Sequence, residues 1–172
     1  MSPYEHVDNW ILPASALTDS IAEMAGDGRK GNEGIVLWAG TSEGGIARVT
    51  QLIGLHGPLI EKRPLQMIIA PDLFAKVSIF CGRRKIILIG QIHSHPKTLT
   101  DLSDVDKQYG IATPHFLSVV APHYAQRPDT NWGACGVHVF DEGVGFRRMP
   151  LTEATTRIIL DAAARAPLER LS

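Results

Sequence analysis

Hydrophobic and polar positions along the chain follow two different periods, which indicates interleaved helices and strands. In the first helical segment, Leu17, Ile21 and Met24 fall on one face. Gly26 and Gly82 each stand where a glycine commonly ends a helix. The spacing predicts helices over residues 13–25 and 71–81, one beginning near Ser103, and a terminal one over residues 152–165.

Short apolar runs bounded by turn residues predict the strands. The run Glu33–Gly40 is apolar on both faces, as expected of a strand that is covered on both sides. Gly44-Gly45 and Asp141–Gly143 favour hairpins, so the sheet is expected to be mixed. Residues 54–64 are expected to form a loop. The predicted strands are 33–40, 46–53, 67–70, 85–93, 115–121, 134–140 and 144–149, and the fold class is α/β.

Composition narrows the class of protein without assigning a function. The chain has 172 residues, 44% of them hydrophobic and 20% charged, which predicts a single globular domain over residues 1–172. A formal net charge of -1 gives no electrostatic reason to expect nucleic-acid binding. No apolar stretch is long enough to span a bilayer, and the first residues do not resemble a secretion signal. The two cysteines, Cys81 and Cys135, predict buried free thiols and a reducing, cytoplasmic location.

The segment His93-Ser94-His95-Pro96 carries the strongest chemical signal. Side chains on a strand alternate between faces, so His93 and His95 should point the same way at the end of a buried strand. Pro96 favours an extended backbone at His95 and stops the strand. Two imidazoles in this arrangement suit a metal ion, although a pair of this kind can also be exposed or satisfied by backbone groups.

A second segment, Ser103-Asp104-Val105-Asp106, follows Pro96 after six further residues. It has a structural interpretation as a helix start, with Ser103 as the N-cap and Asp106 closing a capping box. It also offers a hydroxyl and a carboxylate at a fixed position, which suits a metal ligand. Asp101 and Asp104 are rival ligands by composition alone.

Together these segments resemble the signature of the JAMM metalloproteases, also called JAB1/MPN/Mov34 domains, in which His-x-His-Pro is followed after six residues by Ser-x-x-Asp. That family also has a glutamate just before a strand, and Glu33 is similar to it, with Glu43 as a rival inside a turn. The resemblance implies one MPN-like domain with a curved mixed β-sheet flanked by helices. The short length of the chain resembles that of the compact, stand-alone bacterial members of the family.

The resemblance also implies a chemistry. His93, His95 and Asp106 would hold Zn²⁺, Glu33 would act as the general base, and Ser103 would donate a hydrogen bond to the oxyanion. The expected reaction is hydrolysis of the amide bond after the C-terminus of a ubiquitin-like protein. E1-like or E2-like enzymes of the same system are expected partners, with antiphage defence as one setting. A zinc peptidase acting on a short peptide or a sulfur-carrier adduct, and a catalytically silent scaffold, are the alternatives.

Several other residues are assigned structural roles. Trp38 and Trp132 are expected to pack in the core or at its rim. His115, at the start of an apolar strand, is expected to be a satisfied histidine and not a fourth ligand. The basic runs Arg83-Arg84-Lys85 and Arg147-Arg148 are expected to be solvated.

Overall fold

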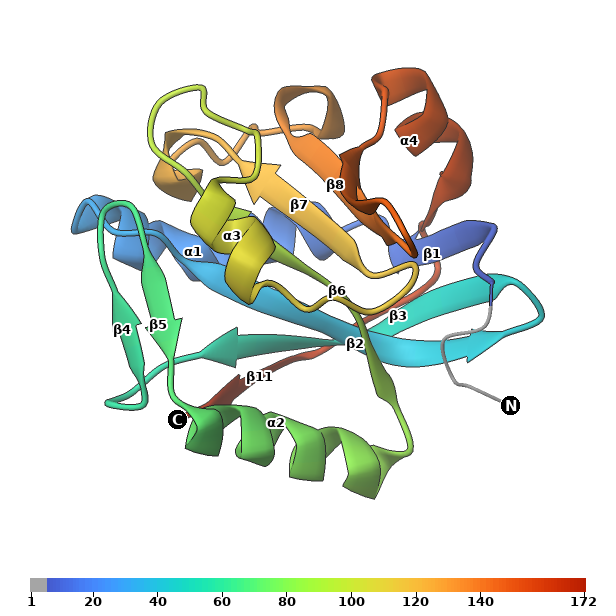
Figure 1. The fold of residues 1–172 in the computed structure, drawn as a ribbon, viewed down its shortest axis with the longest axis horizontal. Helices are drawn as coiled ribbons and strands as arrows, with labels where there is room; N and C mark the ends of the chain where they lie inside the picture. The colour runs from blue at the N-terminus through green and yellow to red at the C-terminus, as the bar shows by residue number, and fades with distance from the viewer. Residues whose placement is uncertain (1–5) are drawn as a thin grey trace.

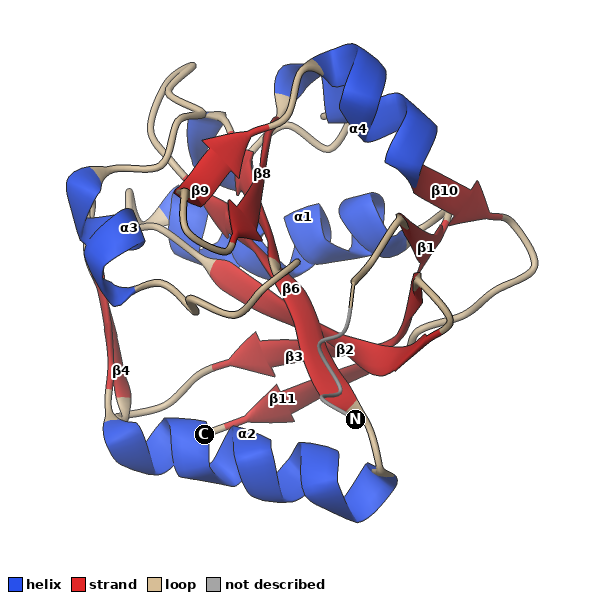
Figure 2. Cartoon of the chain, turned by 45° about the vertical axis from the view of Figure 1, so that its right-hand side comes forward, coloured by secondary structure: helices blue, strands red, loops and turns tan. Residues whose placement is uncertain are grey.

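A computed structural model describes residues 6–172, which form a mixed β-sheet flanked by helices (Figures 1 and 2). The helices are α1 (Ala16–Arg29), α2 (Pro71–Arg84), α3 (Asp104–Tyr109), α4 (Leu151–Arg157) and the short 3-10 turns η1 (His123–Ala125) and η2 (Trp132–Ala134). The strands are β1 (Asn9–Pro13), β2 (Ile35–Glu43), β3 (Ile46–Leu55), β4 (Ile60–Lys62), β5 (Met67–Ile69), β6 (Ile87–Ser94), β7 (Leu117–Ala121), β8 (Gly136–Asp141), β9 (Gly145–Arg148), β10 (Ile158–Asp161) and β11 (Leu168–Leu171).

Nine strands make one curled sheet in the order β10-β1-β3-β2-β6-β7-β8-β9, with β11 pairing to β3 beside this path. Pairing is parallel for β6 with β7 and for β1 with both its neighbours, and antiparallel for β2 with both of its neighbours. β4 and β5 form a separate two-stranded hairpin. The predicted fold class, a curved mixed sheet flanked by helices, is therefore confirmed.

The central strand β2 separates two hydrophobic cores, because its side chains alternate between the two faces of the sheet. Val36 and Trp38 pack with the apolar stripe of α1, behind the sheet in Figure 1. Ile35 and Leu37 pack on the other face with α2, which lies along the lower side of the sheet in both views. Burial on both faces explains why this segment is continuously apolar.

The glycines predicted to end helices do not end them. α1 runs through Gly26 and Gly28 to Arg29, and it is Gly31 that takes the positive φ of +72°. Gly28 instead allows the Tyr124 backbone to approach α1 closely, because a Cβ added at Gly28 would lie 2.0 Å from the carbonyl oxygen of Tyr124. α2 likewise passes through Gly82 and is closed by Lys85 in a left-handed conformation.

The largest error of the sequence interpretation lies at the C-terminus. A helix over 152–165 is wrong: α4 ends at Arg157, and the next four residues form β10. Ile158 pairs with Trp10 of β1, a strand that the pattern did not predict. The expected loop over 54–64 also contains the short strand β4, and β11 was not anticipated.

Both tryptophans singled out above are packed as expected. Trp38 is fully buried, and its ring lies 6.1 Å from that of the partly buried Trp132. Cys81 and Cys135 are buried free thiols, also as predicted. Among residues 6–172 there is no helix both long and apolar enough to traverse a bilayer.

Candidate metal centre

The histidine pair sits at the end of β6, an interior strand of the sheet. His93 pairs in register with Ile35 on β2 and with Val120 on β7, so its backbone is fixed from both sides. His95 lies just beyond the strand, and its amide donates to the carbonyl of Ala121 over 2.9 Å. Both imidazoles are buried and point the same way, with their Nε2 atoms 3.1 Å apart. The predicted orientation of the pair is therefore observed.

Asp106 is placed by the start of α3. Ser103 caps the helix: its Oγ accepts from the Asp106 amide at 3.1 Å and donates to Asp106 Oδ2 at 2.7 Å. The Ser103 amide also donates to the same carboxylate oxygen at 2.8 Å. The capping box thus forms with aspartate in the third helical position, and it fixes the rotamer of Asp106. The hydrogen bonds that cap the helix are thus the same ones that orient the Asp106 carboxylate toward the histidines.

The three predicted ligands converge. Asp106 Oδ2 lies 3.2 Å from His95 Nε2 and 3.6 Å from His93 Nε2. Bonds of the usual length from a tetrahedral metal would place its ligand atoms roughly 3.3–3.4 Å apart. The observed distances bracket that value, so the donor set fits a single divalent ion with no rearrangement. Within residues 6–172 this is the one group of three or more side chains arranged to hold a metal.

Glu33 faces this group from the segment just before β2. Its Oε1 lies 3.6 Å from His95 Nε2, and the residue is only 3% exposed. The following residue, Gly34, is joined to the histidine segment twice: its amide donates to Ser94 Oγ at 2.9 Å, and its carbonyl accepts from the Ser94 amide at 3.1 Å. Ser94 therefore aligns Glu33 with the histidines, a role that the sequence did not suggest.

The electrostatics of the four groups are coupled. Burial raises the pKa of Glu33 to about 7. Burial alone would also raise the pKa of Asp106, but its contacts with His93 and His95 outweigh this and hold the pKa well below its usual range. For His95, burial disfavours the charged ring, yet the hydrogen bond with Asp106 and the charge of Glu33 leave its pKa raised. The cluster thus combines a stable carboxylate with a carboxyl group that titrates near neutral pH.

The rival residues lie elsewhere. Asp101 is exposed and pairs with Arg148, and Asp104 is exposed on the first turn of α3. Glu43 ends β2 at the hairpin, opposite Ile46 and far along the strand from Glu33. His115 does not join the cluster; its carbonyl accepts a hydrogen bond from Trp10 Nε1, and its ring packs edge-on against His6.

A groove of about 490 Å³ opens onto the candidate metal centre, between β5 on one side and α3 on the other. β6 supplies Gln91 and His93 to its floor. β5 has β4 as its one strand neighbour within residues 6–172, so its other edge is free. Large apolar side chains are exposed on both sides of the groove: Ile68 from β5, and Val105 and Tyr109 from α3.

Two carboxylates and two imidazoles that converge at the end of a strand, beside an open groove, define a site built for metal-assisted hydrolysis. Comparison with known proteins agrees with this class. The chain is 26% identical over 130 residues to a probable metalloprotease, y4jG, of Sinorhizobium fredii (strain NBRC 101917 / NGR234), covering 74% of this chain and 80% of that protein. No protein-family model matches the chain.

Among solved structures, the chain is similar to a Desulfitobacterium hafniense protein known from its solution structure, with a TM-score of 0.65 and 18% identity over 90% of this chain and 94% of that one. It also overlaps with a JAB1/MPN domain protein from Archaeoglobus fulgidus, covering 88% of this chain and 98% of that one, with 13% identity and a TM-score of 0.42. The metalloprotease relative agrees with a metal-dependent hydrolase, and the residues of the motif that resembles the JAMM signature converge in the structure.

Proposed function

We propose that the chain is a zinc-dependent JAMM-type metallopeptidase that hydrolyses the amide bond after the C-terminal tail of a ubiquitin-like protein. The observation that carries the proposal is the approach of the Asp106 carboxylate to both imidazoles, at 3.2 and 3.6 Å, with buried Glu33 beside them. Two nitrogen ligands and one oxygen ligand with space for a fourth position are typical of a catalytic zinc site.

Zn²⁺ held by His93, His95 and Asp106 would supply a Lewis acid that makes water acidic near neutral pH. The carboxylate of Glu33 accepts a proton from the attacking water and returns it to the leaving amine, a role that suits a group with a pKa of about 7. The Ser103 hydroxyl, which donates to Asp106 Oδ2 in this structure, turns to donate to the developing oxyanion.

The groove supports a polypeptide substrate. An extended substrate tail can pair with the free edge of β5, while its apolar side chains contact Ile68 on one side of the groove and Val105 on the other. Small residues next to the scissile bond would allow the backbone to approach the buried histidines. These features favour the flexible C-terminal tail of a ubiquitin-like protein over a compact, folded segment.

The experiment is a cleavage assay on the metal-loaded chain, followed by mass spectrometry. The substrates are a linear ubiquitin-like fusion, an isopeptide-linked conjugate and short peptides. Cleavage after the tail that is lost in Glu33→Gln and retained in Asp104→Asn supports the proposal. Cleavage of short peptides alone would redirect it to a general peptidase. A chain that binds metal stoichiometrically and cleaves none of them would be a silent scaffold.

A further inference from the structure

The turn His123–Ala125 has an uncommon backbone conformation directly beside the metal centre. Three consecutive non-glycine residues take positive φ: 55° at His123, 53° at Tyr124 and 55° at Ala125. Each L-residue in this conformation costs roughly 1–2 kcal/mol. Strain of this kind persists only where the surroundings enforce it, and it concentrates at functional sites.

The surroundings enforce the turn from two directions. On the metal side, the Tyr124 amide donates to the His95 carbonyl at 2.8 Å, and the His123 amide donates to the Lys97 carbonyl. On the α1 side, Gly28 leaves room for the Tyr124 carbonyl, and Gln126 Nε2 donates to the Gly28 carbonyl at 2.6 Å. The turn is therefore clamped between the C-terminal part of α1 and the backbone of a metal ligand.

This placement sends the Tyr124 side chain toward the hairpin loop between β4 and β5. Its hydroxyl donates to the Pro64 carbonyl at 2.9 Å. The neighbouring carbonyl, that of Arg63, accepts the amide of Glu33 at 3.0 Å. Tyr124 thus spans from the backbone of His95 to the loop that holds the backbone of Glu33.

We propose that Tyr124 is a positioning residue, which fixes the distance between the general base Glu33 and the ligand His95 through the Pro64 carbonyl. The inference rests on the function proposed above. The backbone at Glu33 is held on one side through Gly34, which bonds to Ser94, and on the other through the loop that Tyr124 contacts. Removing the phenol hydroxyl would leave the metal ligands in place and free the loop that carries one of the two restraints on Glu33.

Tyr124→Phe tests the bridge, because it removes one hydrogen bond and keeps the ring. With the fusion substrate of the cleavage assay, kcat should fall about 5- to 100-fold while KM and metal stoichiometry stay unchanged. Thr130→Val is the matched control, since it also removes one exposed side-chain donor to a backbone carbonyl in the segment after the turn. Its kcat should stay at the wild-type level.

A second readout does not depend on turnover. Amide exchange measured by NMR should speed up at Glu33 in Tyr124→Phe and stay unchanged at Val119 in the middle of β7. Gly28→Ala, which pushes on the turn from α1, should give the same local change, and its effect should not add to that of Tyr124→Phe. Unchanged protection at Glu33 overturns the inference, whatever the activity; absent turnover in the wild type, with faster exchange in the variant, overturns only the proposed function.

Discussion

His95 Nε2 and Asp106 Oδ2 lie 3.2 Å apart, although His95 follows directly after β6 and Asp106 lies in the first turn of α3. The connection between them carries no regular secondary structure. It is fixed at its first end by the sheet and at its last end by the Ser103 cap. The geometry of the candidate metal centre therefore depends on tertiary structure, because both ends of this connection must be held in place.

Loss of the carboxylate ligand should abolish tight metal binding. In Asp106→Asn the charge that balances the cation disappears, and we expect metal affinity to fall by more than about 100-fold, beyond the 10–100-fold typical of outer-shell changes. Asp104→Asn, on the same exposed turn, is the control and should bind as the wild type does. Calorimetric titration of the metal-free proteins measures both; equal affinities in the two variants would contradict the assignment of Asp106.

Ser103→Ala should affect stability and metal binding together. The N-cap is lost, which costs about 1 kcal/mol in the free energy of unfolding, and Asp106 loses its orienting partner. Metal affinity is then expected to drop about 10–100-fold. Urea denaturation of the metal-free protein and metal titration provide the two numbers. A fall in kcat alone, with both quantities intact, would instead confine Ser103 to oxyanion stabilisation.

Glu33 should make the stability of the metal-free protein depend on pH. Its pKa is raised from the usual 4.5 to about 7, so the folded state retains a proton that the unfolded state loses. Stability should therefore fall as pH rises from about 4.5 to about 7, by an amount on the order of 3 kcal/mol. Denaturation midpoints of the wild type and Glu33→Gln across this window test it. Parallel curves for the two proteins would mean that folding leaves the pKa of Glu33 unchanged, and would contradict the prediction.

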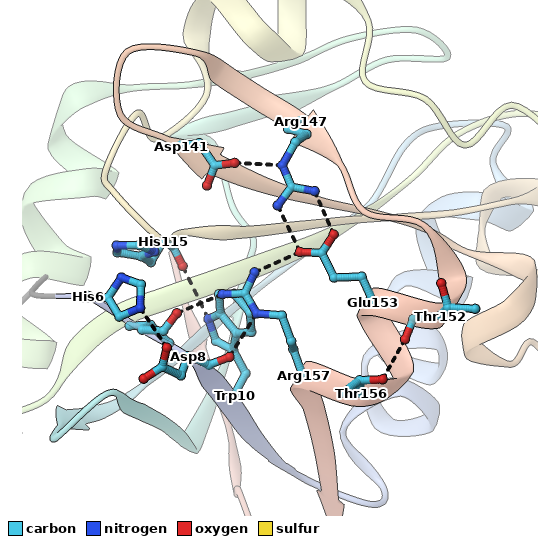
Figure 3. A network of polar contacts seen from close by, with 11 residues as sticks. His6, Asp8, Trp10, His115, Asp141, Arg147, Thr152, Glu153, Thr156 and Arg157 are labelled. Atoms are coloured by element: carbon cyan, nitrogen blue, oxygen red, sulfur yellow. Dashed lines mark hydrogen bonds and ion pairs between the residues drawn. The ribbon is translucent and has the colours of Figure 1, made fainter.

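Glu153 joins the two ends of the curled sheet (Figure 3). It accepts two hydrogen bonds from Arg147 of β9 and one from Arg157, which in turn donates to the carbonyls of Val7 and Asp8 beside β1. Hydrogen bonding to Arg147 lowers the pKa of Glu153 to about 2. The stabilisation of the folded state by ionised Glu153 is therefore fully present above pH 4.5, its usual pKa, and is lost as pH falls from about 4.5 toward 2.

Glu153→Gln should therefore destabilise the protein at neutral pH, by about 1–2 kcal/mol for a partly exposed, bidentate network. The difference from the wild type should vanish in acid, where the wild-type carboxylate is protonated. Glu142→Gln, an exposed carboxylate in the β8–β9 turn, is a suitable control. Thermal unfolding at pH 7 and at about pH 1, below the lowered pKa of Glu153, separates the cases; a deficit that persists unchanged at the lower pH would assign the effect to packing.

Local patterns predicted most of the sheet. β2, β6 and β7 coincide with apolar runs that predicted strands, and the apolar start of β2 and the whole of β7 are buried as expected. The hydrophobic pattern predicted the wrong secondary structure where pairing with a distant strand determines the conformation. Residues after Arg157 have an ambiguous period, and they become a strand because β1 offers an edge to Ile158. No local signal encodes that partner, since tertiary contacts override propensity in short segments.

His93 and His95 were identifiable as a candidate ligand pair from their spacing on one strand, whereas Asp106 was separated from its rivals Asp101 and Asp104 only by the family resemblance. Glu33 was identifiable only through the family resemblance, since nothing near it in sequence shows that β2 pairs with β6. Ser94 and Tyr124 gave no signal at all. Their contributions are hydrogen bonds to backbone atoms of distant segments, and such bonds leave little trace in residue type.

The left-handed conformation of His123–Ala125 also bears on how the protein could be made more robust. Glycine tolerates this backbone region freely, so Ala125→Gly would relieve unfavourable energy that the native chain stores beside its reactive groups. Such a replacement could raise the melting temperature while loosening the spacing of the groups that perform the chemistry. Thermal stability and turnover would then change in opposite directions, and a screen for heat resistance alone would select variants with lower catalytic activity.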